Sequence, residues 1–260
     1  MTRTSVHPTS VVSPTAELGH GVTIGPFCVI HDNVTVGAHS IVDSHVVLGA
    51  PTADFFDGPA TYEARSCRIG ARAVIRSHSV VYAGADVGDD FECGHHVTIR
   101  EGTRLGSSVR VGTRSDLQGE LVVGDCARLH SNVFVAQRTT IEDFVWLLPN
   151  VMLANDPHPP SDSCTIGPTI RRFAVVSTGA TVFPGVEIGE GAVVGAMALV
   201  RENVPPGVVA VGIPSRIVGH AQDVECRDGN LEQVYPWWHH FRRGYPAGAL
   251  PPPERDGELG

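Results

Sequence analysis

A six-residue period constrains the fold of this chain more than any other feature of its sequence. An aliphatic residue returns at every sixth position, as in Val182, Ile188, Val194 and Val200. A small residue usually stands four positions after each of these, as Ala198 does after Val194. The period matches neither the helical repeat of about 3.6 nor the strand repeat of 2. One long helix or one long strand therefore cannot account for it, and a repeating architecture is indicated.

The period fills most of the chain in three blocks. Its aliphatic positions run through residues 6–48, 69–153 and 170–200, and among them only Cys93 is not Leu, Ile or Val. We interpret each hexad as a short strand followed by a bend, with the aliphatic and small residues pointing inward. A glycine often follows the aliphatic residue, and we expect it to permit the bend. Three such sides, each one hexad long, close a triangular coil, so the sequence predicts nearly ten stacked coils.

This repeat resembles the hexapeptide-repeat family of left-handed parallel β-helices, which are mostly acyltransferases. The resemblance covers roughly residues 5–219. It implies an all-β fold, a left-handed parallel β-helix of about ten coils. We therefore expect a β-helix acyltransferase domain over residues 1–219 and a short C-terminal tail over residues 220–260. Within the tail, residues 230–246 could hold a short helix broken by Pro236, and the last residues are typical of a flexible end.

Two breaks in the period predict two loops, over residues 49–68 and 154–169. Counted in steps of three hexads, both leave after the third side of a coil and hence from the same edge of the prism. Long loops on a rigid scaffold are where binding and catalytic sites tend to lie. The alternative is a pair of tolerated insertions.

Composition narrows the classes of partner. The net charge of −9 argues against nucleic acid, which binds basic surfaces. All 19 basic residues are arginine, which indicates either a GC-rich genome or binding of phosphates. No apolar run reaches the length of a membrane span and no signal peptide is visible, so we expect a cytoplasmic protein without membrane contact. The six cysteines show no CxxC spacing, and Cys28 and Cys93 are expected to be reduced core residues.

Polar side chains gather on two adjoining sides of the middle coils, because residues three hexads apart stack along the prism. We assign substrate binding to residues on these sides, namely Arg76, His78, His96, Arg100, Arg114 and Asn132. One interpretation is a hydrated surface with hydrogen-bonded ladders. The other is a cleft between two subunits, where the resembled family places its active sites. That second interpretation implies a homotrimer.

The segment 204–219 resembles the end of the acetyl-CoA-dependent members of the family, where a Gly-x-Pro-x-Arg turn lies beside the cofactor. The resemblance implies acetyl-CoA, or another acyl-CoA, as co-substrate. It places at the CoA end Gly212, Pro214, Ser215 and Arg216, and along the pantetheine arm the backbone of Gly179, Ala180 and Ala198. The alternative is a turn that only terminates the coils.

Two resemblances imply different acceptors for the acyl group. Residues 46–85 resemble the first half of UDP-N-acetylglucosamine O-acyltransferase, but Gln137 stands where that enzyme carries its catalytic histidine. Residues 151–162 resemble the Thr-Asn-Asp loop of nucleotide-linked amino-sugar N-acetyltransferases. Asn155 and Asp156 match that loop, while an alanine replaces the threonine. We therefore favour CoA-dependent N-acyl transfer, most simply N-acetyl transfer, to the amine of a nucleotide-linked amino sugar, with sugar O-acyl transfer as the alternative.

The chemistry of this transfer selects the candidate catalytic residues. An amine must be unprotonated to attack a thioester, and the resulting oxyanion needs a hydrogen-bond donor. The candidates for proton transfer and for orienting the sugar are His130, Asn155, Asp156 and His158. Nothing in the sequence indicates a covalent intermediate.

Two alternatives belong to other classes of protein. Residues 114–125 faintly resemble a γ-type carbonic anhydrase, whose zinc needs three histidines across a subunit interface. Here His78, His96 and His130 are close in the predicted coils, but the pair of histidines five residues apart is missing. We therefore expect no metal. A non-catalytic scaffold is the remaining alternative.

Overall fold

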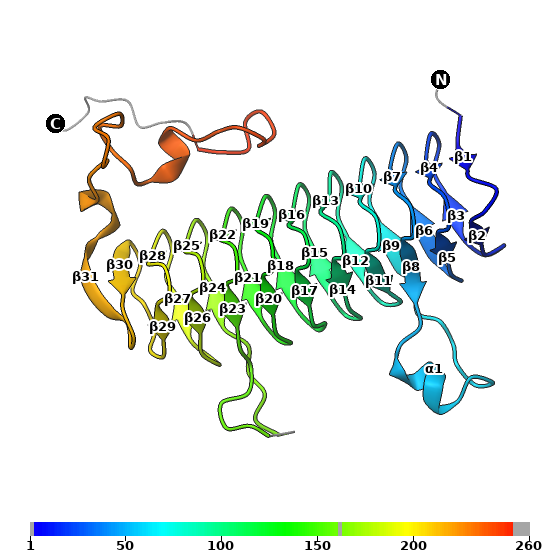
Figure 1. Ribbon diagram of the computed structural model, residues 1–260, viewed down its shortest axis with the longest axis horizontal. Coiled ribbons are helices and arrows are strands. Elements are labelled where there is room, and N and C mark those ends of the chain that lie inside the picture. The colour runs from blue at the N-terminus through cyan, green and yellow to red at the C-terminus, as the bar shows by residue number, and fades with distance from the viewer. Residues whose placement is uncertain (1–2, 161–162, 252–260) are drawn as a thin grey trace.

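The computed structural model describes residues 3–160 and 163–251, and it forms a three-sided prism of stacked coils (Figure 1). Residues 161–162 of the second predicted loop lie outside the described residues, and so do residues 252–260 of the predicted flexible end. The architecture is all-β and is consistent with the expected left-handed β-helix. None of the helices in the described ranges is long and apolar enough to cross a membrane.

Each side of the prism is one sheet, and we name the sides sheets A, B and C. Sheet A contains, in spatial order, β1 (Ser5–Val6), β4 (Thr23–Ile24), β7 (Ile41–Val42), β10 (Val74–Ile75), β13 (Glu92–Cys93), β16 (Arg110–Val111), β19 (Arg128–Leu129), β22 (Trp146–Leu147), β25 (Val175–Val176), β28 (Val193–Val194), β30 (Val208–Val211) and β31 (Arg216–His220). Sheet B contains β2 (Val11–Val12), β5 (Val29–Ile30), β8 (Val47–Ala50), β11 (Val80–Tyr82), β14 (Thr98–Ile99), β17 (Asp116–Leu117), β20 (Phe134–Val135), β23 (Met152–Leu153), β26 (Thr181–Val182) and β29 (Leu199–Val200). Sheet C contains β3 (Glu17–Leu18), β6 (Val34–Val36), β9 (Cys67–Ile69), β12 (Asp86–Val87), β15 (Arg104–Leu105), β18 (Val122–Val123), β21 (Thr140–Ile141), β24 (Thr169–Ile170) and β27 (Glu187–Ile188).

The predicted stacking of residues three hexads apart is confirmed by the strand register. Strand β13 pairs in parallel with β16, so that Glu92 lies opposite Arg110, and β16 pairs in the same way with β19. The same register recurs from β1 to β29 wherever no loop intervenes, and it changes at the C-terminal end, where Val193 of β28 lies opposite Val209 of β30. Outward side chains at equivalent positions of successive coils therefore form straight files along the prism.

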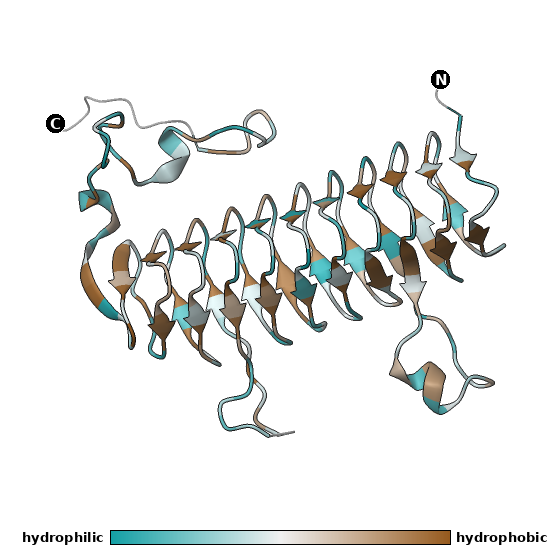
Figure 2. Ribbon diagram, in the orientation of Figure 1, coloured by the Kyte–Doolittle hydropathy of each residue, from teal (hydrophilic) through white to brown (hydrophobic). Residues whose placement is uncertain are grey.

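The core consists of the predicted inward residues. One hydrophobic cluster extends from Val22 to Ala210 and includes the aliphatic residue and the small residue of almost every hexad. Figure 2 shows these hydrophobic residues recurring on the strands along the prism. Each buried aliphatic side chain contributes about 1.5–3 kcal/mol, so the repeat supplies most of the stability of the prism.

The glycines have a different role from the one that we expected. Gly70 and Gly88, which directly follow aliphatic residues, have no positive φ. The left-handed conformation falls two positions later, as at Arg72 with φ of 57°. A Cβ on Gly70 would lie 2.4 Å from the carbonyl carbon of Gly88 in the next coil. These glycines are therefore required by the close approach of successive coils rather than by the bend.

Both loops leave from the edge between sheets B and C, as predicted. The first follows β8 and contains the short helix α1 (Ala53–Asp57), and the second follows β23. Figure 1 shows both loops projecting to the same side of the prism.

The end of the chain departs from the coils. Strand β31 turns back antiparallel on β30, and two 3₁₀ turns follow, η1 (Ala221–Asp223) and η2 (Trp237–His239). The helix that we expected over residues 230–246 is absent from the described part of the tail, where only the single turn of η2 follows Pro236. A proline at this point leaves too few residues for a stable α-helix.

Candidate functional site

The outer surface of sheet A carries a file of charged and aromatic side chains. Glu92, Arg110, Arg128 and Trp146 stand in register on β13, β16, β19 and β22. Each residue directly precedes an inward aliphatic residue or Cys93 and therefore points outward, because side chains alternate along a strand. The repeat places these four side chains in one line.

The C-terminal tail packs over part of this surface. Trp237 and Leu250 of the tail are buried against Cys126, Phe144 and Phe173, which stand at the corner between sheets C and A. The indole of Trp237 donates a hydrogen bond to the carbonyl of Phe173 at 3.2 Å. The tail aromatics thus pack on the coils, and Figure 1 shows the tail, in orange and red, turning back beside them.

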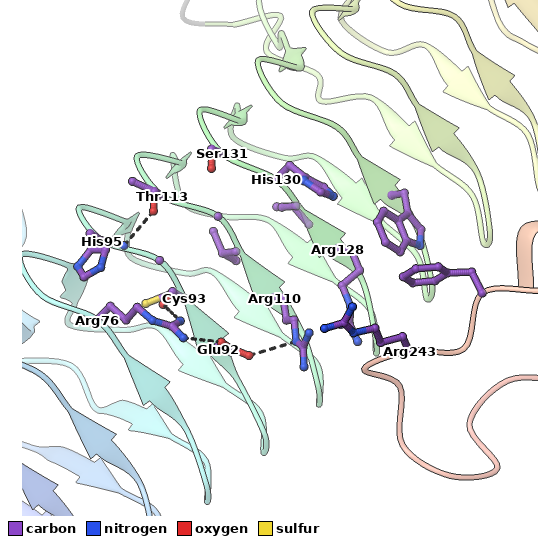
Figure 3. A pocket seen from close by; sticks show the side chains of 16 residues that line it. Arg76, Glu92, Cys93, His95, Arg110, Thr113, Arg128, His130, Ser131 and Arg243 are labelled. Carbon is purple, nitrogen blue, oxygen red and sulfur yellow. Dashed lines mark hydrogen bonds and ion pairs between the residues drawn. The ribbon is translucent and has the colours of Figure 1, made fainter.

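Between the tail and sheet A lies a groove of about 650 Å³. We call it the sheet A groove, and its lining residues are Arg76, Glu92, Cys93, Gly94, His95, Arg110, Val111, Gly112, Thr113, Arg128, Leu129, His130, Ser131, Trp146, Phe241 and Arg243. Arg76, Gly94, Gly112 and His130 form a second file, in which each residue lies three hexads after the one before. The two glycines leave the floor of the groove open between the side chains of Arg76 and His130, which Figure 3 labels. Two predicted site residues, Arg76 and His130, are therefore brought into one cavity.

Positive charge dominates this groove. Four arginines line it against a single glutamate, in a protein whose net charge is −9. Glu92 pairs with Arg76 at 2.7 Å and with Arg110 at 3.2 Å. The guanidinium of Arg76, which also hydrogen-bonds Glu92, holds the pKa of that carboxyl below its usual range. The groove therefore suits an anionic ligand.

Two histidines line the groove, and His130 is the candidate base, because the ring of His95 is already hydrogen-bonded to Ser77 at 2.7 Å. The His130 imidazole is half-buried, and burial lowers its pKa from the ordinary 6.5. The ring lies 5.5 Å, between centroids, from the indole of Trp146. The hydroxyl residues Thr113 and Ser131 line the same cavity. A neutral imidazole in this position can accept a proton from a bound nucleophile.

The remaining residues assigned to substrate binding lie outside the groove. His78, His96, Arg114 and Asn132 stand in left-handed conformations at the corner between sheets A and B, where they are exposed. The rings of His78 and His96 stack with centroids 4.9 Å apart. Arg100 lies on sheet B, where it pairs with Glu101 at 2.8 Å and contacts the ring of Tyr82.

The loop residues lie at a different edge of the prism. Asn155, Asp156 and His158 belong to the second loop, between sheets B and C. The backbone N–H of His158 donates to the Asp156 carboxylate at 3.1 Å, and the carbonyl of Asn155 accepts from Ile166. None of these three residues lines the sheet A groove of the same chain.

A smaller hollow of about 220 Å³ marks the C-terminal end of the coils. Three residues of the predicted CoA end, Pro214, Ser215 and Arg216, line it together with Arg201 and Glu202. Gly212 lies in the adjoining turn with φ of 101°, and its carbonyl accepts from Leu199. The sequence motif therefore forms a concave surface that carries two arginines.

The backbone donors assigned to the pantetheine arm already have partners within the coils. The N–H of Gly179 donates to Pro149, that of Ala180 to Ser177 and that of Ala198 to Gly195. The side chains of Ala180 and Ala198 are buried. A ligand along this corner would therefore contact the backbone surface without these N–H groups.

Several residues of the groove were missed at the sequence level. Counting in steps of three hexads from Glu92 finds Arg110, Arg128 and Trp146. The sequence period could therefore have shown that these outward side chains lie in one line. Phe241 and Arg243 had no such signal, because the tail does not share the period. Among the described residues, no group of three or more His, Cys, Asp and Glu side chains could hold a metal ion.

Comparison with known proteins agrees with this architecture. Residues 4–50 match the family described as bacterial transferase hexapeptide (six repeats). The chain is 32% identical over 139 residues to a serine acetyltransferase from Salmonella typhimurium, and the match covers 52% of this chain and 49% of that protein. It is 32% identical over 91 residues to the galactoside O-acetyltransferase of Escherichia coli, with 32% of this chain and 45% of that protein covered.

A solved structure shows the same fold. The UDP-N-acetylglucosamine acyltransferase of Arabidopsis superposes with a TM-score of 0.68 at 18% identity, covering 83% of this chain and 74% of that chain. This likeness shows the fold, and the family match shows that residues 4–50 are similar to hexapeptide-repeat transferases. The chain spans about half the length of the curated relatives compared above.

Proposed function

We propose that the chain is an acyl-CoA-dependent acyltransferase that binds its acceptor in the sheet A groove. The observation that carries the proposal is His130, a half-buried imidazole with a lowered pKa that lines a groove together with four arginines. Such a base is neutral at pH 7 and can take a proton from an attacking group. The similarity to proteins named as serine and galactoside acetyltransferases supports acyl transfer.

The acceptor that fits this groove best is a nucleotide-linked amino sugar. Arginine binds phosphate oxygens through paired N–H donors, so the arginines suit the phosphates of a nucleotide. The amine would then lie near His130 and attack the thioester carbonyl. As the C–N bond forms and the C–S bond breaks, His130 takes the amine proton and returns it to the leaving CoA sulfur.

The CoA end of the site is proposed at the C-terminal hollow. Arg216 and Arg201 there would contact the phosphates of CoA, beside Ser215. From β19 to β30 four strand spacings intervene, or about 19 Å at the usual spacing. The pantetheine arm would cover this span along the corner that holds Gly179.

Asn155, Asp156 and His158 reach the groove only if they come from another subunit, since they lie at a different edge of their own prism. We therefore propose a homotrimer in which the second loop of one subunit borders the groove of its neighbour. Sedimentation at micromolar concentration tests this assembly, and a monomer that retains full turnover would exclude it.

Transfer to a hydroxyl is the second candidate, and one observation favours it. A hydroxyl needs a general base more than an amino-sugar amine does, and His130 provides a neutral one.

The test is release of free CoA thiol from acetyl-CoA in the presence of UDP- and dTDP-linked amino sugars, with the N-acetylated sugars as hydroxyl-only acceptors. Turnover with the amino sugars that falls with His130→Asn supports N-acyl transfer. Turnover with the N-acetylated sugars supports the hydroxyl candidate. Absence of thiol release with every acceptor contradicts the proposed activity.

A further inference from the structure

Arg128 is a buried cation without a carboxylate partner. The residue is only 5% exposed, yet its guanidinium donates to backbone carbonyls, those of Ser108 at 2.5 Å and Gly244 at 2.6 Å. Its other close partner is the ring of Tyr245, 4.3 Å away. No ion pair joins it to an acidic residue within the described ranges. Burial of a charge without a counter-charge is unfavourable, and a bound anion would relieve it.

The neighbouring charges increase this need for an anion. Burial lowers the pKa of Arg128, and repulsion by Arg110 adds to this effect, while Tyr245, Cys126 and Glu92 act in the opposite direction. Glu92, the one acidic residue of the groove, is already paired with Arg76 and Arg110. The end of the groove near the tail therefore holds more positive charge than its own carboxylate can balance.

The tail brings a further arginine to this end of the groove. Gly244, with φ of 80°, packs so closely that a Cβ there would lie 2.8 Å from Nη1 of Arg110. Arg243 directly precedes it and lines the groove, and Figure 3 shows its side chain beside that of Arg128. Arg243 makes no hydrogen bond or ion pair with another described residue, whereas Arg242 donates to the carbonyl of Pro251.

Aromatic contacts hold the tail in this place in addition to the hydrogen bond from Arg128 to Gly244. Trp237 and Trp238 pack on Phe173, and the rings of Phe173 and Trp238 stack with centroids 4.0 Å apart. The ring of Tyr245 packs on Phe144 at 5.9 Å. Because these aromatic contacts fix the backbone on both sides of Arg243, its side chain has a defined position at the groove.

We propose that the C-terminal tail completes a diphosphate site in the sheet A groove, formed by Arg110, Arg128 and Arg243, with Arg243 as a specificity-determining residue. The inference rests on the proposed function for the nature of the acceptor, a nucleotide-linked sugar. Its phosphates would neutralise the excess charge near the tail and leave the sugar directed toward His130. The competing explanation is that Arg110 and Arg128 serve only to hold the tail.

Isothermal titration calorimetry with inorganic pyrophosphate separates these explanations on the full chain. The variants are Arg243→Gln and Arg243→Lys, with Arg242→Gln as the matched control because that arginine is adjacent but does not line the groove. Loss of one charge-assisted contact should weaken pyrophosphate binding about tenfold or more in Arg243→Gln. Arg243→Lys should recover part of the loss, and Arg242→Gln should bind like the wild type. Unchanged melting temperatures show that the tail is still docked.

The pyrophosphate-binding results test the diphosphate site without requiring that acyl transfer be found. Wild-type binding of pyrophosphate that is weakened by Arg243→Gln but not by Arg242→Gln supports it, even if no acyl transfer is found. Equal binding by Arg243→Gln and wild type overturns the role of the tail, and absence of binding by the wild type overturns the diphosphate site. In either of these two cases acyl transfer to a neutral acceptor would leave the proposed function standing.

Discussion

Sheets A and C are built from the same repeat, yet the groove described above lies on sheet A. On sheet C the position after each aliphatic residue is mostly glycine, as at Gly70, Gly88 and Gly106. On sheet A the same position holds Arg76 and His130, with glycines between them. The inward residues of the two sides are interchangeable, so the core does not distinguish them. Function is therefore carried by the outward positions, which the repeat leaves free to vary.

The charges of the two surfaces differ in the same way. On sheet C several of them are paired, as in Arg68 with Asp86 at 2.6 Å and Arg171 with both Glu142 and Glu187. On sheet A the arginines outnumber the glutamate and one of them is buried. Paired surface charges are neutral toward a ligand, whereas an excess of one sign attracts the other. The following predictions test whether this difference is functional.

The largest effect is expected from His130→Asn. Removing a general base should lower turnover by about 10²–10⁴-fold, with little change in melting temperature because the ring is only half-buried. His39→Asn is the matched control, since that histidine is exposed at another corner and its φ of 61° suits asparagine. Steady-state kinetics on both variants checks this. Equal turnover in the two variants would remove His130 from the mechanism.

The next effect is structural and should be the same on both surfaces. A Cβ on Gly112 of sheet A would lie 2.4 Å from the backbone of His130, and one on Gly88 of sheet C 2.5 Å from the oxygen of Gly106. Alanine at either position should destabilise the fold by about 1–3 kcal/mol through overpacking. Chemical denaturation measures this, and a stable Gly112→Ala with an intact groove would show that the coils can separate locally.

A smaller effect is expected in the pH profile. The folded pKa of His130 lies below its ordinary 6.5, so the folded protein resists protonation. The stability that the neutral imidazole contributes is full above 6.5 and is lost as the pH falls from there through the lower folded pKa, because the unfolded chain binds the proton more readily. The acidic limb of kcat/KM should have its midpoint below 6.5 in the wild type. A midpoint at or above 6.5 would exclude His130 as the titrating base.

The smallest effect is expected on sheet C. Arg68→Gln breaks a half-exposed ion pair with Asp86, and such pairs contribute about 0–1 kcal/mol. We expect turnover equal to that of the wild type and a nearly unchanged melting temperature by calorimetry. Loss of turnover in Arg68→Gln would show that the two surfaces are not functionally distinct.

The fold was predictable because its signal is a strict period in the inward residues. The coil of three hexads, the core and the edge of both loops all followed from counting, and so did the shared file of Arg76 and His130. The role of the glycines was misjudged, because a sequence period does not distinguish a bend from a close approach between coils. The left-handed bend falls on His78 and Asn132, whose residue types favour it, but also on Arg72 and Phe173, whose types do not, so composition alone does not mark it.

The groove itself was only half predictable. Arg128 and Trp146 belong to an outward file, but their importance depends on the tail that covers them. The tail has no period, and its docking depends on aromatic contacts between residues as distant in sequence as Phe173 and Trp237. The loop residues Asn155 and Asp156 matched a motif, yet a match in sequence does not say whether they face a groove of their own chain or of another.

The most direct test of the central claim is a crystal structure of the protein with a UDP-linked amino sugar and CoA. The account predicts density for the diphosphate between Arg110, Arg128 and Arg243, with the sugar extending toward His130 and CoA at the hollow that contains Arg216. Sugar-nucleotide density confined to another surface, with the sheet A groove holding only solvent, would contradict it.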